Sequence, residues 1–295
     1  MGAKMRDEII ENIRRTCPRI HSITNTITIN DCANIILAAG GSAVMASDPE
    51  EVSEMTSLCD GLVLNLGAVA SREAMFRAGK TANSLNHPIV FDPVAAGSTT
   101  LRRETSLRLM KELRLTAIRG NASEIHALAV LLEEGREQEQ QSFVDATKSQ
   151  VMQEANLERC LADAQWLSGQ TGAIIVVSGI EDLIVQGDHY QVCRGGSALS
   201  ARITGSGCML SELMGTCLAG VRKEKVDGER QDQKGTMIAS QPISEWDAVC
   251  AAVEWMNEAA ERAELKIKEV QGGTMTYRMM LIDEISRWDG SHKKG

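Results

Sequence analysis

Short apolar runs alternate with longer amphipathic stretches along almost the whole chain. The short runs have the length and residue types of buried strands, and they lie at 42–46, 61–66, 88–91, 115–118, 173–177, 183–185 and 199–203. The longer stretches have helical spacing and lie at 29–39, 71–85, 101–113, 123–132, 157–167, 208–221, 244–263 and 274–287. This alternation predicts an α/β fold in which one mostly parallel central sheet carries helices on both faces.

Polar residues and glycine punctuate most of the junctions between these elements. In the helix expected at 29–39, Asn30 and Asp31 are candidate N-caps, and the Gly40-Gly41 pair is a stop signal. Local chemistry therefore agrees with the periodicity at the first of these helices.

Two polar stretches interrupt the alternation, at 133–155 and at 222–242. The first is rich in Glu and Gln and the second in charged residues and glycine, so we expect both to be solvent-exposed insertions. The first stretch also has the composition of a charged helix. The alternation resumes after each insertion, so neither marks a domain boundary, and we expect residues 1–295 to form a single domain.

Composition excludes several classes of partner. A net charge of −9 and a total of only four Trp, two Tyr and three Phe disfavour nucleic-acid binding. The eight cysteines form no C-x-x-C pair and no zinc-like cluster with the five histidines, so we expect reduced thiols. No apolar run approaches the roughly 20 residues of a membrane span, and the charged N-terminus does not resemble a secretory signal. We expect a cytoplasmic protein with no nucleic-acid or membrane partner.

The strongest local signal is the glycine-rich segment around Gly205, Gly207 and Cys208. A β-branched run leads into this turn, and an apolar helix is expected to follow it. Glycines allow a ligand to approach the backbone, and the free N–H groups of a helix N-terminus attract an anion. Leu210 stands where a dinucleotide-binding fingerprint needs a third glycine, which excludes that motif. Glycine spacing alone fits an ordinary strand-to-helix turn equally well, so other features have to decide.

Two carboxylates follow neighbouring predicted strands. Asp92 comes directly after the run 88–91, and Glu124 begins the helix that follows Asn121. The carboxyl ends of parallel strands share one edge of a sheet, and Mg²⁺ prefers one or two carboxylates together with water and phosphate oxygens. A turn cap before Pro93 and a first-turn helix carboxylate are the alternative interpretations. Together with the glycine turn, the two carboxylates favour a metal site.

Arg119 and Ser178 are expected at the same edge of the sheet. An arginine there could hold phosphate groups in a charge-assisted fork, with a salt bridge to Glu124 as the alternative. Ser178 follows the run 173–177 and opens a Ser-Gly turn, where its hydroxyl could contact a nucleotide or simply belong to the turn.

Taken in order, these elements resemble the hydroxyethylthiazole kinase family of the ribokinase-like superfamily, over nearly the whole chain. The segments that carry the resemblance are His21-Ser22-Ile23-Thr24-Asn25, Val44-Met45-Ala46, Leu64-Asn65-Leu66-Gly67, Asp92-Pro93-Val94, Ile118-Arg119-Gly120-Asn121 with Glu124, Ser178-Gly179 and Thr204-Gly205-Ser206-Gly207-Cys208. The resemblance implies transfer of the ATP γ-phosphate to the primary hydroxyl of 4-methyl-5-(2-hydroxyethyl)thiazole in thiamin salvage. It also implies Mg²⁺, ATP as co-substrate, and a homotrimer with substrate sites at subunit interfaces.

The resemblance also assigns roles to individual residues. The thiazole pocket is formed by Asn25, Met45 and Gly205, the Mg²⁺ site by Asp92 and Glu124, and the nucleotide site by Arg119 and Ser178, with Gly207 in the anion hole of the helix terminus.

Cys208 stands where sugar kinases of the superfamily carry an aspartate base, whereas the thiazole kinases carry cysteine. The thiol is therefore a candidate base. A helix N-terminus lowers the pKa of a thiol and a neighbouring ATP raises it, which leaves the protonation state of Cys208 open at the level of sequence.

Two features depart from the family pattern, and the residues also fit other functions. Gly272-Gly273-Thr274 replaces a more typical Gly-Pro-Gly, and the two insertions are longer than the family pattern leads us to expect. The alternatives are a kinase for a hydroxymethylpyrimidine, a pyridoxal-like alcohol or a hydrated nicotinamide nucleotide, an acyl transferase with Cys208 as nucleophile, and a non-catalytic regulator that binds thiazole or nucleotide. The acyl-transferase hypothesis does not explain Asp92 and Glu124.

Overall fold

An eight-stranded sheet forms the centre of the computed structural model, which describes residues 3–133, 154–227 and 243–288. Its strands are β1 (Arg19–Ile23), β2 (Ser42–Val44), β3 (Gly61–Asn65), β4 (Ile89–Asp92), β5 (Ala117–Asn121), β6 (Ile174–Ser178), β7 (Asp182–Gln186) and β8 (His189–Cys193). They lie in the order β2-β1-β3-β4-β5-β6-β7-β8. Neighbours from β2 to β6 are parallel, and β7 is antiparallel to both β6 and β8. The predicted mostly parallel sheet is confirmed.

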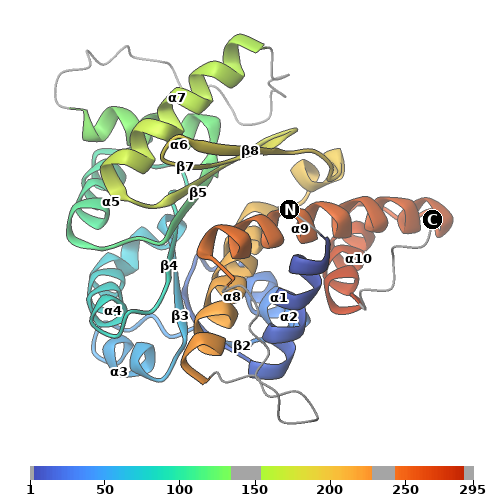
Figure 1. Ribbon diagram of the computed structural model, residues 1–295, viewed down its shortest axis with the longest axis horizontal. Helices are drawn as coiled ribbons and strands as arrows, with labels where there is room; N and C mark the ends of the chain where they lie inside the picture. The colour runs from blue at the N-terminus through green and yellow to red at the C-terminus, as the bar shows by residue number, and fades with distance from the viewer. Residues whose placement is uncertain (1–2, 134–153, 228–242, 289–295) are drawn as a thin grey trace.

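Helices cover both faces of this sheet (Figure 1). One face carries α1 (Ala3–Thr16), α2 (Ile29–Ala39), α8 (Ser206–Asp227), α9 (Glu245–Glu269) and α10 (Thr274–Ser286). The other carries α3 (Val52–Ser57), α4 (Arg72–Ser84), α5 (Thr100–Glu112), α6 (Ala122–Leu132) and α7 (Glu154–Thr171). Two short 3₁₀ helices, η1 (Leu66–Ser71) and η2 (Ala198–Arg202), complete the elements of the described part of the chain.

The hydrophobic core consists of two layers, one on each face of the sheet. Alternate residues of one strand belong to different layers, so that Val63 of β3 packs with α8 and its neighbours Leu62 and Leu64 pack on the α4 side. All five residues of β3 are buried. Burial on both faces explains why the central strands are continuous apolar runs.

Two strands and two helices were not predicted, and one predicted strand is wrong. β1 contains His21 and Ser22, which are buried because hydrogen bonds satisfy their polar atoms, and β8 is a largely polar edge strand. The helices α1 and α3 were also missed. The run 199–203, predicted as a strand, lies mostly within η2, where Ser197 Oγ accepts a hydrogen bond from Leu199 N.

Two details of the predicted helix boundaries also need correction. The N-cap of α2 is Thr28, and Asp31 lies inside the first turn of the helix, where it pairs with Arg278 of α10. Gly40 ends this helix at φ 101°, as the stop signal predicted. The second expected insertion begins too early, because α8 continues to Asp227. Residues 134–153 and 228–242 of the two insertions lie outside the described part of the chain.

Helix α8 lies close to the sheet and to α1 because glycines face both of these neighbours. A Cβ atom on Gly215 would lie 2.6 Å from Val63 Cγ2, and one on Gly220 would lie 2.8 Å from Ile13 Cγ1. These distances are well below van der Waals contact, so both positions require glycine for this packing. The close approach brings the N-terminus of α8 to the edge of the sheet where the parallel strands end.

We expect Gly215→Ala to destabilise the protein by about 1–3 kcal/mol, because its methyl group would overpack the contact with Val63. Glycine-to-alanine changes within helices otherwise stabilise by up to about 1 kcal/mol. Gly169→Ala in α7 is the matched control, since a Cβ there meets no atom within 4 Å. Urea denaturation of both variants tests this packing, and a Gly215→Ala protein as stable as Gly169→Ala would contradict it.

Candidate active site

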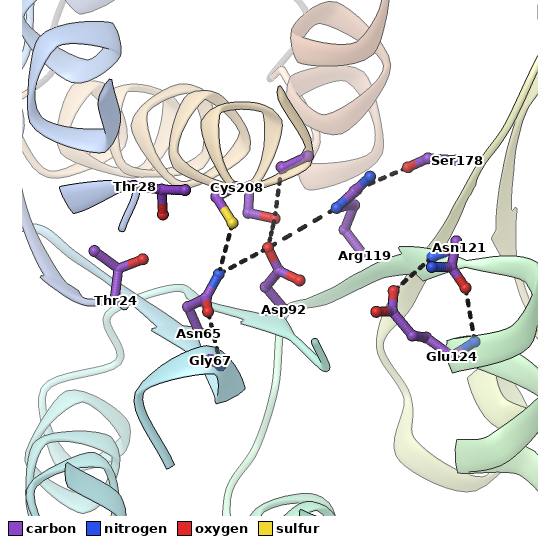
Figure 2. Close-up of polar contacts among 12 residues, drawn as sticks. Thr24, Thr28, Asn65, Gly67, Asp92, Arg119, Asn121, Glu124, Ser178 and Cys208 are labelled. Atoms are coloured by element: carbon purple, nitrogen blue, oxygen red, sulfur yellow. Dashed lines mark hydrogen bonds and ion pairs between the residues drawn. The ribbon is translucent and has the colours of Figure 1, made fainter. Parts of the chain in front are cut away.

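Polar side chains from several strand ends meet at one edge of the sheet, beside the start of α8 (Figure 2). Asn65 and Asp92 are the last residues of β3 and β4 and are register partners. Ser178, the last residue of β6, pairs in register with Asn121 of β5. The structure brings Asp92, Arg119 and Ser178 together at this edge, as the strand ends predicted, and places Cys208 of α8 beside them.

The N-terminus of α8 opens directly onto these side chains. Gly205 has φ 86°, and a Cβ there would lie 2.7 Å from Thr28 Cγ2, so both conformation and space require glycine. The helix begins at Ser206, and the N–H of Met209 makes the first-turn bond to the carbonyl of Gly205. The N–H groups before Met209 have no partner within the helix and form a site for an anion.

Arg119 lies across this helix terminus. Its guanidinium rests directly against Gly207, with no room for a side chain at that position. Its Nε donates to Ser178 Oγ at 2.7 Å, and its Nη1 lies 3.9 Å from Asp92 Oδ2. The alternative of a salt bridge between Arg119 and Glu124 is therefore not what the structure shows.

Asp92 is a fully buried carboxylate. Its Oδ2 accepts hydrogen bonds from Asn65 Nδ2 at 3.1 Å and from Ser211 Oγ at 2.9 Å, whereas its Oδ1 has no hydrogen-bond partner. Burial raises the pKa of Asp92 to about 6, and the positive charge of Arg119 opposes that rise. The carboxylate thus has one held oxygen and one free oxygen.

Glu124 has a defined structural role at the start of α6. Its Oε2 accepts from the N–H of Asn121 and its Oε1 from the N–H of Ala95, both at 2.9 Å. The Asn121 side chain accepts in return from the N–H of Glu124, which completes a capping box. Figure 2 shows the Glu124 carboxylate turned toward this backbone, beside the group around Asp92.

Cys208 lies in the first turn of α8, and Asn65 Nδ2 donates to its sulfur at 3.1 Å. Burial, with a smaller contribution from the nearby Asp92 carboxylate, raises the pKa of the thiol to about 11. A thiol with this pKa is protonated at neutral pH. The sequence left the protonation state of Cys208 open, and the structure favours the neutral thiol.

The three residues expected to form a substrate pocket follow neighbouring elements. Asn25 comes after β1, and its Nδ2 lies 3.8 Å from Cys208 Sγ. Met45 is half-buried directly after the edge strand β2, and Gly205 contacts Thr28. Asn25 and Gly205 are thus placed beside the start of α8, and Met45 lies at the outer side of β1.

Three residues of this region were not assigned a role from sequence, namely Asn65, Ser211 and Glu212. Asn65 ends its strand as Asp92 does, which is a signal that could have found it. Ser211 and Glu212 lie one helical turn after Cys208, and nothing in their spacing distinguishes them from residues of an ordinary amphipathic helix.

Glu212 is buried beneath this group of side chains. Its Oε1 accepts from Ser22 Oγ at 2.5 Å, and its Oε2 has no hydrogen-bond partner. Burial raises the pKa of Glu212 to about 8, against the effect of the Ser22 hydrogen bond. The acid is therefore largely neutral at pH 7.

Residues 3–133, 154–227 and 243–288 contain no group of three or more His, Cys, Asp or Glu side chains arranged to hold a metal ion. None of their helices combines the length and the apolar character required to cross a bilayer.

The fold is that of the ribokinase-like proteins. A ribokinase-like superfamily protein from Enterococcus faecalis V583 superimposes with a TM-score of 0.57, covering 97% of this chain and 95% of that one, at 10% sequence identity. At this level of identity the comparison establishes the fold alone.

Closer relatives identify the family. The model of the hydroxyethylthiazole kinase family matches residues 10–289. The hydroxyethylthiazole kinase of Desulfovibrio desulfuricans is 40% identical over 96% of this chain and 93% of its own length, and that of Clostridium acetobutylicum is 38% identical over 97% and 96%. The structure of the Pyrococcus horikoshii hydroxyethylthiazole kinase has a TM-score of 0.75 at 27% identity and covers 97% of this chain and 94% of its own. This chain belongs to the hydroxyethylthiazole kinase family.

The buried Glu212 should make the stability of the folded protein depend on pH. Its pKa is about 8 in the folded protein and 4.5 for the free side chain, so the folded state binds more protons between these values and stability falls as the pH rises through them. Glu212→Gln removes this titration. We expect the Tm of Glu212→Gln minus that of the parent to be larger at about pH 9 than at about pH 5. A difference that is the same at both pH values, measured by calorimetry, would contradict the burial argument.

Proposed function

We propose that this kinase transfers the γ-phosphoryl group of ATP to the primary hydroxyl of 4-methyl-5-(2-hydroxyethyl)thiazole, a step of thiamin salvage. The observation that carries the proposal is the meeting of the bare α8 N-terminus, the Arg119 guanidinium and the free Oδ1 of Asp92. A phosphoryl group in transfer carries its negative charge on peripheral oxygens, which the helix N–H groups and the guanidinium would stabilise, whereas Asp92 Oδ1 would act through a cation that it binds. Membership of the family supplies the expected acceptor.

The proposed phosphate site lies between Arg119 and the first turn of α8. Both features are positive and they are in direct contact at Gly207, while Asp92 compensates from 3.9 Å on the other side. An anion at this point would separate the two positive groups and would interact favourably with both the helix N-terminus and the Arg119 guanidinium. Ser178 holds the Arg119 Nε and is placed to contact the nucleotide as well.

We assign Mg²⁺ to Asp92 and Glu124. The free Oδ1 of Asp92 is a buried acceptor without a donor, which suits a cation, and each Glu124 oxygen that accepts one N–H retains a lone pair. The bound ion would neutralise charge on the phosphate oxygens. Asp92 and Glu124 fit this role best as a small set of protein ligands completed by water and phosphate.

In this proposal Cys208 lies next to the substrate, and its role as a base is minor. With a pKa of about 11, the thiol holds its proton before the reaction and cannot accept another from the substrate hydroxyl. Phosphoryl transfer has a loose transition state that needs little assistance from a base. Asn25, Met45 and Gly205 are proposed to line the thiazole pocket next to this thiol.

A homotrimer in the cytoplasm, with each chain forming a single domain, completes the proposal. Apolar side chains are exposed near the pocket, with 77% of Ile27 accessible in the loop after Asn25. Met275 and Met279 of the neighbouring helix α10 are 61% and 63% exposed. Exposed apolar surface next to a substrate pocket supports a subunit contact there.

The division of labour between Asp92 and Cys208 predicts different kinetic losses. We expect Cys208→Ala to retain measurable phosphorylation, within about tenfold of the parent kcat, and Asp92→Ala to lose at least about 100-fold. Cys208→Asp should remain active because it supplies a base at the same position. Comparable kcat values for Cys208→Ala and Asp92→Ala would refute the assignment. The assay follows the thiazole phosphate ester by mass spectrometry after incubation with Mg·ATP, with a hydroxymethylpyrimidine as the competing acceptor.

The oligomer makes a separate prediction. Light scattering coupled to gel filtration should give three times the chain mass of 32.0 kDa. Ile27→Asp should shift the protein toward smaller species, whereas Leu85→Asp, at an exposed position where α4 ends, should not. A monomeric parent protein, or equal effects of the two variants, would contradict the proposed contact.

A further inference from the structure

Asn65 uses every hydrogen-bonding atom of its side chain within the active site. Its Nδ2 donates to Asp92 Oδ2 and to Cys208 Sγ, each at 3.1 Å. Its Oδ1 accepts from the N–H of Gly67 at 2.8 Å and from Asn25 Nδ2 at 3.4 Å. Asn65 is only 1% exposed, so water does not compete for these partners.

The orientation of this amide is fixed by its partners. The Gly67 N–H can only donate, so it must face the Asn65 oxygen, and the Asp92 carboxylate must then face the nitrogen. In the reverse orientation, the amide NH2 group would face the Gly67 N–H, and the amide oxygen would face the Asp92 carboxylate. Figure 2 shows the amide between these groups, with its nitrogen toward both the carboxylate and the sulfur.

The limited space beside Gly67 also constrains the Asn65 amide. The φ angle of Gly67 is not positive, so its backbone conformation would accept alanine. A Cβ atom would nevertheless lie 2.6 Å from Asn65 Oδ1 and 2.9 Å from Asn25 Cβ. Glycine at this position therefore preserves the placement of two amide side chains that both contact Cys208.

Asn65 also determines which oxygen of Asp92 is available. The donors of Asn65 and Ser211, and the more distant Arg119, all lie on Oδ2. Oδ1 is thereby left as the oxygen without a partner. Removing Asn65 would free the carboxylate to rotate and would release the sulfur of Cys208 in the same step.

We propose that Asn65 is the positioning residue that joins the Asp92 carboxylate to the Cys208 sulfur and fixes both for phosphoryl transfer. Asn65 acts through these two groups and does not itself take part in the reaction. The assignment rests on the proposed roles of Asp92 and Cys208, and it extends them to a side chain that holds the two in register. Misplacement of reacting groups by about 1 Å costs on the order of 100-fold in rate.

The test is steady-state kinetics of Asn65→Ala with Mg·ATP and the thiazole alcohol. We expect kcat to fall about 10- to 100-fold, with a smaller rise in the KM for Mg·ATP, because the exact orientation of Asp92 matters more in the transition state than in the ground state. The loss should be smaller in a Cys208→Ala background, since one of the two positioned groups is then already absent. Gly67→Ala, which pushes the amide from the other side, should lower kcat in the same way.

Asn83→Ala is the matched control. The Asn83 amide clamps the backbone of Arg114 by two hydrogen bonds of 2.9 and 2.8 Å, where α4 ends and away from the strand ends that form the site. It should lose stability but keep the parent kcat. A folded Asn65→Ala protein with kcat within twofold of the parent, or with its loss confined to KM, would overturn the proposal.

Asp92→Asn separates a failure of this inference from a failure of the proposed site. An Asp92→Asn protein with parent kcat would remove the basis of the proposed site and of the Asn65 assignment together. An inactive Asp92→Asn beside a fully active Asn65→Ala would overturn the role of Asn65 alone. If Asn65→Ala does not fold, Gly67→Ala still tests the proposal, and unchanged kcat in that variant would overturn it.

Discussion

The burial of the Asp92 carboxylate at the end of β4 is the constraint on which the rest of the site depends. A buried charge has to be compensated, and here the compensation comes from Asn65, Ser211 and Arg119, which lie on three different elements. All three face one oxygen, so the other is left without a partner. The same geometry thus compensates a charge in the core and leaves one carboxylate oxygen available to the proposed cation.

Helix α8 connects this carboxylate to the fold. Small residues on its inner side let it lie close against β3, and the same helix brings an N-terminus free of side-chain bulk to the strand ends. Gly207 accommodates the Arg119 guanidinium, and Gly215 accommodates Val63 two turns later. The packing of α8 and the proposed anion site both depend on one close approach, so a change that lifts the helix from the sheet should affect both.

Much of this arrangement is visible in the sequence, because parallel strands place their carboxyl ends at one edge. That rule located Asp92, Arg119, Ser178 and the turn before Cys208, and the periodicity located most of the helices. The periodicity failed for β1, because the buried His21, whose ring nitrogens are hydrogen-bonded, counts as a polar position in the sequence. It also failed for η2, because the apolar residues of η2 have the pattern of a strand. The burial of Glu212 and the hydrogen-bond partners of Asn65 depend on tertiary contacts, although the place of Asn65 near a strand end is visible in the sequence. Glu124 was correctly placed at the start of α6, but its capping of the helix through the backbone became visible only in three dimensions.

In the proposed reaction, the transferred phosphoryl group lies between the α8 N-terminus and Arg119, next to the free oxygen of Asp92. The most direct measurement is a crystal structure with Mg²⁺, a non-hydrolysable ATP analogue and the thiazole alcohol. The account predicts that the γ-phosphate accepts hydrogen bonds from the first-turn N–H groups of α8, and that Arg119 has moved from Gly207 to contact it. A γ-phosphate bound elsewhere, with Arg119 still against Gly207, would contradict the account.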